Sequence, residues 1–193
     1  MIILGSASKR RSEILNFFSI PFRQVASNFN EDSIHFEGNP QKYAATLAEK
    51  KGESLSLQFP KELILTADTV VFCNNTLYNK PKDLEEGARF LSELSGKWQS
   101  VFTAVSLYQN GQKETKVEET RLLFETLSQE QIHLFLAHCD YQDKAGSYTI
   151  QGIGSLLVRR IEGCYYNVAG LPIHTTRHLL KTAGIDLWHH LKK

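Results

Sequence analysis

Two segments rich in β-branched and aromatic residues, 98–108 and 116–126, flank the pair Asn110-Gly111. Asn-Gly between two such runs is a strong signal for a hairpin, because a two-residue type I′ turn needs a positive φ at both of its positions. The spacing therefore predicts a long antiparallel β-hairpin in the second half of the chain.

The first half of the chain alternates between strand-like and helix-like patterns. An apolar run at 2–4 is followed by turn residues at 5–8 and then by apolar residues at helical spacing. Pro40 begins a second helix, and the short apolar run 63–67 is typical of a buried strand with Asp68 at its end. Together with the hairpin, this alternation predicts an α/β fold in which a mixed sheet is flanked by helices.

The length and charge of the chain exclude several classes of protein. With 193 residues, we expect one domain spanning residues 1–193. Hydrophobic residues make up 41% and charged residues 22%, which argues against a disordered chain or a coiled coil. The formal net charge is only +1, so no global field draws the protein onto duplex nucleic acid or an anionic membrane. We expect neither as a partner.

The cysteines and the hydropathy pattern bear on location. Cys73, Cys139 and Cys164 are an odd number without a CxxC pair, which fits neither a disulfide framework nor a zinc site and favours a reducing compartment. No segment has the pattern of a signal peptide or the length of a membrane span. We therefore expect a cytoplasmic protein.

The turn after the first apolar run is the first candidate site. Ser6 and Ser8 are followed by three cations at positions 9–11, in the first turn of the expected helix. Cations are unfavourable there because the helix macrodipole is positive at that end, so their presence suggests a bound anion. Serine hydroxyls and arginine guanidinium groups are suited to hold phosphate oxygens. The alternative is that Ser8 is an ordinary N-cap and the cations are solvated.

Two carboxylates are candidates for metal binding or proton transfer. Asp68 follows a buried strand, where a carboxylate is costly unless it is paired, hydrogen-bonded or bound to a metal. In hydrolysis at phosphorus, Mg²⁺ neutralises charge and a carboxylate orients water. Glu31 lies among polar residues and is a candidate for the second carboxylate. The alternatives are a turn-forming Asp68 and a solvated Glu31.

Three further polar residues carry weaker signals. Lys51 and Lys80 belong to a residue type that is mostly at the surface, although Pro81 stiffens the loop that presents Lys80. Gln151 lies in a segment of small and polar residues, where its amide either reads the edge of a base or stabilises its own loop.

Together these segments resemble the Maf family of nucleoside triphosphate pyrophosphatases, from residue 3 to about residue 180. Several separated motifs in the right order are more specific than any one of them. The motifs are Ser-x-Ser-x-Arg-Arg (Ser6, Ser8, Arg10, Arg11), a loop glutamate (Glu31), a helix lysine (Lys51), Ala-Asp-Thr-Val (67–70), Lys-Pro-x-Asp (80–83), Ser-Gly (95–96), Asp-Lys-Ala-Gly-x-Tyr-x-Ile-Gln-Gly-x-Gly (143–154) and Tyr-x-Asn-Val-x-Gly-Leu-Pro (165–172). Departures from the pattern are Lys9 in place of a common Pro, Asn79 in place of Gly, and Gln99 in place of His.

The resemblance implies an elongated α/β fold of two lobes around a central cleft, shared with inosine triphosphate pyrophosphatases. It also implies hydrolysis between the α and β phosphates of a nucleoside triphosphate, which gives a monophosphate and pyrophosphate and uses a divalent cation, Mg²⁺ or Mn²⁺. Within the family, the sequence is most similar to the dTTP/UTP pyrophosphatase branch.

The same resemblance implies a role for each site residue. Asp68 would be the proton acceptor or a metal-linked carboxylate, and Glu31 would assist the divalent cation, so both are expected as catalytic and metal-binding residues. Ser6, Ser8, Arg11, Lys51 and Lys80 would bind the phosphates, and Arg10, Thr69 and Gln151 would select the base. The alternative function is a nucleotide-binding regulator with little hydrolysis, because the family is also associated with restraint of septum formation. The oligomeric state, a homodimer included, is left open.

Overall fold

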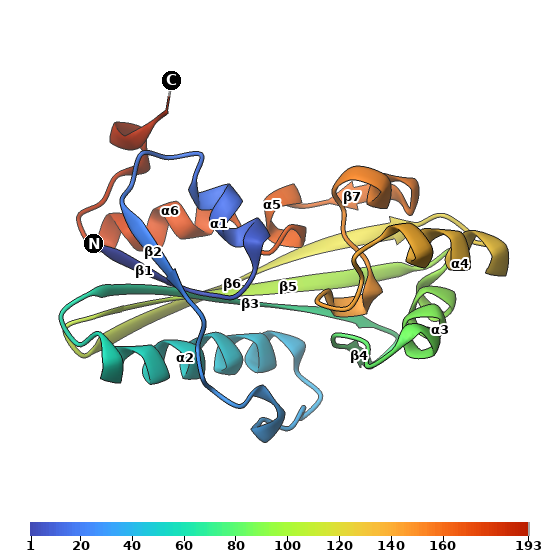
Figure 1. Cartoon of the computed structure of the whole chain (residues 1–193), viewed down its shortest axis with the longest axis horizontal. Helices are drawn as coiled ribbons and strands as arrows, with labels where there is room; N and C mark the ends of the chain where they lie inside the picture. The colour runs from blue at the N-terminus through green and yellow to red at the C-terminus, as the bar shows by residue number, and fades with distance from the viewer. Residues whose placement is uncertain (193) are drawn as a thin grey trace. The chain divides into compact units, whose positions relative to one another are not determined.

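A computed structural model of the chain describes residues 1–192 (Figure 1). Its strands are β1 (Ile2–Gly5), β2 (Phe22–Val25), β3 (Leu63–Cys73), β4 (Thr76–Tyr78), β5 (Trp98–Gln109), β6 (Gln112–Phe124) and β7 (Val158–Glu162). Its α-helices are α1 (Lys9–Leu15), α2 (Pro40–Gln58), α3 (Leu84–Leu94), α4 (Gln129–His138), α5 (Tyr165–Val168) and α6 (Ile173–Thr182). Short 3₁₀ helices are η1 (Glu31–Ser33), η2 (Ala145–Ser147), η3 (Gly152–Leu156) and η4 (Leu187–His190).

The strands form one mixed sheet. Within residues 1–192 its order is β2-β1-β3-β5-β6-β7, and β4 pairs with β3. Strand β1 is parallel to both β2 and β3, whereas β3–β4 and β6–β7 are antiparallel pairs. Asn110 and Gly111, which join β5 to β6, have φ values of 51° and 77°, as a type I′ turn requires. The predicted mixed sheet with flanking helices and the predicted hairpin are confirmed.

The described residues divide into two compact units, each assembled from separate stretches of the chain. Unit 1 comprises Met1–Asp68, Thr103–Glu118 and the chain from Gly170 onward, and unit 2 comprises Thr69–Phe102 and Glu119–Ala169. Strands β3, β5 and β6 each contribute residues to both units. The single domain over residues 1–193 and the two lobes around a cleft stay predictions.

In unit 1, helix α2 covers one face of the sheet, and α1 and α6 lie on the opposite face (Figure 1). Helix α2 begins at a side-chain cap, in which Asn39 Oδ1 accepts the N–H of Lys42 at 2.9 Å. Its docking depends on Gly5, because a Cβ there would lie 2.4 Å from Leu55 Cδ1 and 2.5 Å from Thr66 Cγ2. The absence of a side chain at Gly5 therefore lets α2 approach the end of β1 closely.

In unit 2, helix α3 packs against α4 and η2. Asp83 and Glu86 have the sequence spacing of a helix cap, and the cap is present, since Asp83 Oδ1 accepts the N–H of Glu86 at 2.8 Å. Ser128 followed by Gln131 is the sequence pattern of a capping box, and the box is complete at the start of α4, because the two residues each accept the backbone N–H of the other. Local side-chain hydrogen bonds thus fix where both helices begin.

Some elements differ from the sequence-based expectation. Asp68 does not end a strand and does not form a turn, because β3 continues through it to Cys73. The β-branched and aromatic residues at 69–72 favour continued strand, and an ion pair compensates the carboxylate. The apolar run at 156–158 is typical of a strand, but strand β7 begins only at its last residue, Val158. The short elements β2, β4 and α5 were not predicted, because three or four residues are too few for a clear period.

Candidate active site

The turn after β1 and the carboxylate of Asp68 come from neighbouring parallel strands of unit 1. Gly5, the last residue of β1, is the Cα partner of Thr66 on β3. Asp68 therefore lies two residues beyond the point where the pairing with β1 ends, where the chain of β1 turns away toward α1. Ligand sites of open α/β sheets lie at such carboxyl ends of parallel strands.

The turn is held by its own serine and by an arginine. Ser6 is buried, and its Oγ accepts the N–H of Ser8 at 3.1 Å and Nη1 of Arg11 at 3.1 Å. Arg11 Nε donates to the carbonyl of Gly170 at 2.7 Å. Ser8 is the N-cap residue of α1 by backbone position, but its side chain makes no capping hydrogen bond. The ordinary N-cap alternative for Ser8 is therefore wrong as far as its hydroxyl is concerned.

A residue that the sequence did not single out also contacts this turn. Gln24 on β2 donates its Nε2 to the carbonyls of Ser6 and Ser8, at 2.8 Å and 3.1 Å. Neither Gln24 nor the Gly170 carbonyl gave a usable sequence signal for this role. Gln24 lies on a short edge strand, and a backbone carbonyl contact across 159 positions is invisible to local pattern analysis.

Lys51, Glu31 and Asp68, which we call the Lys51 group, form the charged centre of unit 1. Lys51 Nζ lies 2.5 Å from Asp68 Oδ1 and 3.0 Å from Glu31 Oε1. Lys51 is 8% exposed and Asp68 is 6% exposed, whereas the Glu31 side chain is 42% exposed. Buried charges are tolerated when they are paired, so each of the two buried residues depends on the other.

Arg11 belongs to the same electrostatic environment. Burial of its guanidinium lowers the pKa of Arg11 from the ordinary value, the nearby charge of Arg10 lowers it further, and the carboxylates of Asp68 and Glu31 act in the opposite direction. The Arg11 guanidinium therefore interacts electrostatically with both carboxylates of the Lys51 group.

Seven of the sequence-predicted site residues belong to unit 1: Ser6, Ser8, Arg10, Arg11, Glu31, Lys51 and Asp68.

The other three predicted site residues belong to unit 2. Thr69 follows Asp68 on β3, and consecutive strand residues direct their side chains to opposite faces of the sheet. Lys80 is exposed, in a loop where the carbonyl of Asn79 accepts the N–H of Gly146 at 3.1 Å. Gln151 precedes η3, and its backbone N–H donates to Thr149 Oγ1 at 3.2 Å. That these residues serve the same site as the Lys51 group stays a prediction.

The donor set of the Lys51 group fits a hard divalent cation. Asp68 and Glu31 offer carboxylate oxygens to one point, and Mg²⁺ in phosphate-processing sites commonly uses one or two carboxylates together with water and substrate phosphates. Among the described residues, no group of three or more His, Cys, Asp and Glu is arranged to hold a metal ion. A cation bound here would therefore depend on ligands from substrate and water.

Comparison with known proteins assigns the chain to a family. The family described as Maf-like protein matches residues 1–183. The chain belongs to the Maf family. The dTTP/UTP pyrophosphatases of Chlamydia felis and Acholeplasma laidlawii are each 40% identical to it, over 98% and 96% of this chain and 97% of each relative. A solved nucleoside-triphosphatase / dITP/XTP pyrophosphatase from Mycobacterium abscessus has a TM-score of 0.42 at 10% identity, covering 65% of this chain and 75% of that one.

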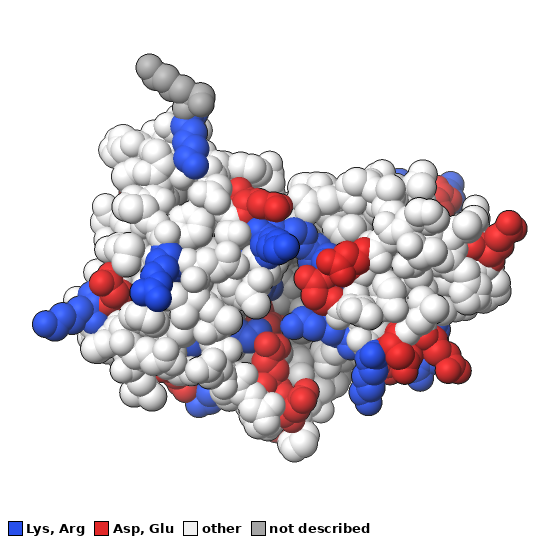
Figure 2. All heavy atoms as spheres, in the orientation of Figure 1, with Lys and Arg blue, Asp and Glu red and all other residues white. Residues whose placement is uncertain are grey.

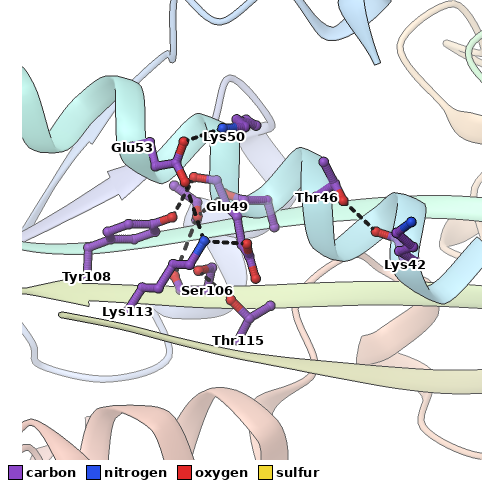
Figure 3. A network of polar contacts seen from close by, with 11 residues as sticks. Lys42, Thr46, Glu49, Lys50, Glu53, Ser106, Tyr108, Lys113 and Thr115 are labelled. Atoms are coloured by element: carbon purple, nitrogen blue, oxygen red, sulfur yellow. Dashed lines mark hydrogen bonds and ion pairs between the residues drawn. The ribbon is translucent and has the colours of Figure 1, made fainter. Parts of the chain in front are cut away.

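The Maf protein has a second lysine between two carboxylates, on the surface of unit 1 (Figure 3). Lys113 Nζ lies 2.6 Å from Glu49 Oε2 and 3.3 Å from Glu53 Oε1, and these three residues are the Lys113 group. The Lys113 side chain is 43% exposed. A hollow of about 340 Å³ beside it is lined by Phe59, Tyr108 and other residues, none of which is a predicted site residue.

The charges of the Maf protein are mixed on the face that Figure 2 shows. Lysine and arginine side chains there are interspersed with aspartate and glutamate and do not merge into one continuous basic area. No helix within residues 1–192 is long and apolar enough to span a membrane. The charge pattern of this face gives no support to binding of a long nucleic acid.

Proposed function

We propose that this Maf protein hydrolyses dTTP and UTP at the bond between the α and β phosphates, giving the nucleoside monophosphate and pyrophosphate. The observation that carries the proposal is the buried Asp68 carboxylate, held by Lys51 beside a turn of serine and arginine donors. Relatives at 40% identity over nearly their whole length are named dTTP/UTP pyrophosphatases, which supports the choice of substrate.

The proposed chemistry needs an acceptor for a proton and donors for phosphate oxygens. Asp68 accepts a proton from water as the water oxygen bonds to phosphorus and the bond to the pyrophosphate oxygen breaks. The guanidinium of Arg11 and the hydroxyls of Ser6 and Ser8 bind phosphate oxygens. Lys51 holds the carboxylate of Asp68 in place through its ion pair, and Glu31 in turn pairs with Lys51.

A divalent cation, Mg²⁺ or Mn²⁺, is part of the proposal. Asp68 and Glu31 are the residues that would hold it, and the ion would neutralise negative charge on the phosphates. Lys51 Nζ contacts one oxygen of each of these carboxylates. Because a carboxylate accepts several contacts, the ammonium group and a cation can share the two side chains. The proposal also includes Lys51 and Lys80 as phosphate ligands, a cytoplasmic location, and three base-selecting residues, Arg10, Thr69 and Gln151.

Pyrophosphate release tests the proposal. Purified protein is incubated with each common triphosphate and with modified pyrimidine triphosphates, with Mg²⁺, with Mn²⁺ and with a chelator. We expect turnover of dTTP and UTP above the purine nucleotides, and loss of turnover with the chelator. Absence of turnover of both pyrimidine nucleotides would refute the proposal. Tight nucleotide binding without turnover would instead favour a nucleotide-binding regulator.

A further inference from the structure

Gln24 reaches from the edge strand β2 to the turn that follows β1. Strands β1 and β2 are parallel, with Leu4 as the Cα partner of Gln24, so the Gln24 side chain starts beside the last residues of β1. Its Nε2 donates to the carbonyl oxygens of Ser6 at 2.8 Å and Ser8 at 3.1 Å. A primary amide has two N–H donors, so the NH₂ group of Gln24 is fully used on two alternate peptides of one turn.

These two hydrogen bonds set the direction of the turn's peptide groups. In a planar trans peptide, the C=O and the following N–H point in opposite directions. Because the carbonyls of Ser6 and Ser8 are directed at Gln24, the N–H groups of Ala7 and Lys9 are directed to the other side of the turn. Gln24 thus determines which side of the turn presents N–H donors.

The turn contains no residue that presets its backbone conformation. Residues 6–8 are Ser-Ala-Ser, and Lys9 occupies the first position of α1, where a proline would preset φ. Inside the turn, the Ser6 hydroxyl accepts the Ser8 N–H. The amide of Gln24 is the contact that ties the carbonyls of this turn to the sheet.

We infer that Gln24 is a positioning residue for the triphosphate, which acts by orienting the peptide groups of residues 6–9. The inference rests on the proposed function, because it takes this turn as a phosphate-binding element. A residue that orients phosphate-binding groups stabilises the bound substrate and the transition state to a similar degree. Its loss therefore raises KM and weakens pyrophosphate binding more than it lowers kcat.

The experiment compares two substitutions of Gln24 with a matched control. Gln24→Met keeps the size of the side chain and removes both donors, whereas Gln24→Lys keeps donors that reach the same carbonyls. Gln112→Met is the control, since Gln112 is an exposed glutamine on strand β6 of the same unit. The readouts are KM and kcat for dTTP, pyrophosphate affinity by calorimetry, and hydrogen exchange of a peptide covering residues 5–11.

We expect Gln24→Met to raise KM for dTTP about tenfold, the size expected for two neutral hydrogen bonds, and to weaken pyrophosphate binding to a similar degree. Its kcat changes less than about threefold, and exchange at residues 5–11 becomes faster. Gln24→Lys restores most of the affinity at about 0.5 M salt, where the added charge is largely screened. Gln112→Met matches the wild type.

Two results would overturn the inference. One is a folded Gln24→Met variant with wild-type KM, pyrophosphate affinity and exchange. The other is a loss of thermal stability and kcat with unchanged KM, which indicates a purely structural role. Failure of the proposed function is seen separately, as a wild-type protein that releases no pyrophosphate. Faster exchange at residues 5–11 in Gln24→Met would then still support the orienting contact.

Discussion

The Lys51 group and the Lys113 group have the same chemical composition, one lysine between two carboxylates, in very different surroundings. Both use helix α2, which supplies Lys51 to the first group and Glu49 and Glu53 to the second. Positions 49 and 53 are one helical turn apart, and position 51 lies on the opposite side of the helix. One face of α2 thus holds a buried charge cluster, and the other holds an exposed cluster.

The comparison indicates that burial, and not a short N–O distance, decides how much an ion pair contributes to stability. The N–O distances of 2.5 Å for Lys51–Asp68 and 2.6 Å for Lys113–Glu49 are nearly equal. Water competes for the exposed charges and salt screens them, so the Lys113 group contributes little to stability. In the buried group, removal of either partner leaves an uncompensated charge, and the carboxylate is available for chemistry away from bulk water.

The largest expected difference between the two groups is in how much a substitution lowers the rate of pyrophosphate release. Asp68→Asn removes the proposed proton acceptor and a charge that fits a cation, so the rate of pyrophosphate release should fall by a factor of about 100 or more. Glu49→Gln, the same chemical change in the exposed group, should leave the rate unchanged. Equal far-ultraviolet circular dichroism would show that both variants are folded. An Asp68→Asn enzyme of near-wild-type rate would remove Asp68 from the mechanism.

The next difference is in stability. Lys51→Met leaves the buried Asp68 carboxylate without its ammonium partner, and the free energy of unfolding should fall by about 3 kcal/mol. Lys113→Met should change it by less than about 1 kcal/mol. Urea unfolding at neutral pH measures both values. If the two lysine substitutions cost the same, burial does not distinguish the two groups.

The smallest expected effect is the pH dependence of the stability that Glu53 contributes in the Lys113 group. The pKa of Glu53 is lowered from its ordinary value of 4.5, first by the hydrogen bond from Lys50 and then by the one from Lys113, while partial burial opposes the shift. A lowered pKa in the folded protein adds stability above the unfolded value, and this contribution is lost as pH falls through the folded value. Because Glu53 is 40% exposed, the wild type should exceed Glu53→Gln by only a few tenths of a kcal/mol at pH 6.

Unfolding curves at pH 6 and at about pH 3, each at low and at high salt, test this prediction for Glu53. The stability difference between the two proteins should vanish at the lower pH and at about 1 M salt. A difference that grows on acidification would contradict the direction of the pKa shift.

The sequence predicted those parts of the fold that depend on interactions between residues close together in the chain. The type I′ turn at Asn110-Gly111, the cap at Asp83 and the capping box at Ser128 are each decided within four residues. Strand β2 could not be predicted in the same way, because its four residues become a strand only by pairing with β1. The course of β3 through Asp68 likewise depends on a partner, Lys51, which is 17 positions away.

The candidate site was predictable as a set of residue types and not as a set of contacts. The motifs identified Glu31, Lys51 and Asp68, but no local pattern shows that one lysine contacts both carboxylates. The same limit applies to Gln24, because an exposed glutamine on an edge strand gives no signal until the turn beside it is known.

The hydrogen bond from Arg11 to the carbonyl of Gly170 limits when this part of unit 1 can complete its folding during translation. The two residues are 159 positions apart, and the stretch that begins at Gly170 is one of the three that build unit 1. A nascent chain that has already formed β1, α2 and β3 still lacks the acceptor of Arg11 until Gly170 has been synthesised. Domains fold as units during translation, so Arg11, the proposed phosphate ligand, acquires its final position only after the stretch that begins at Gly170 has been added.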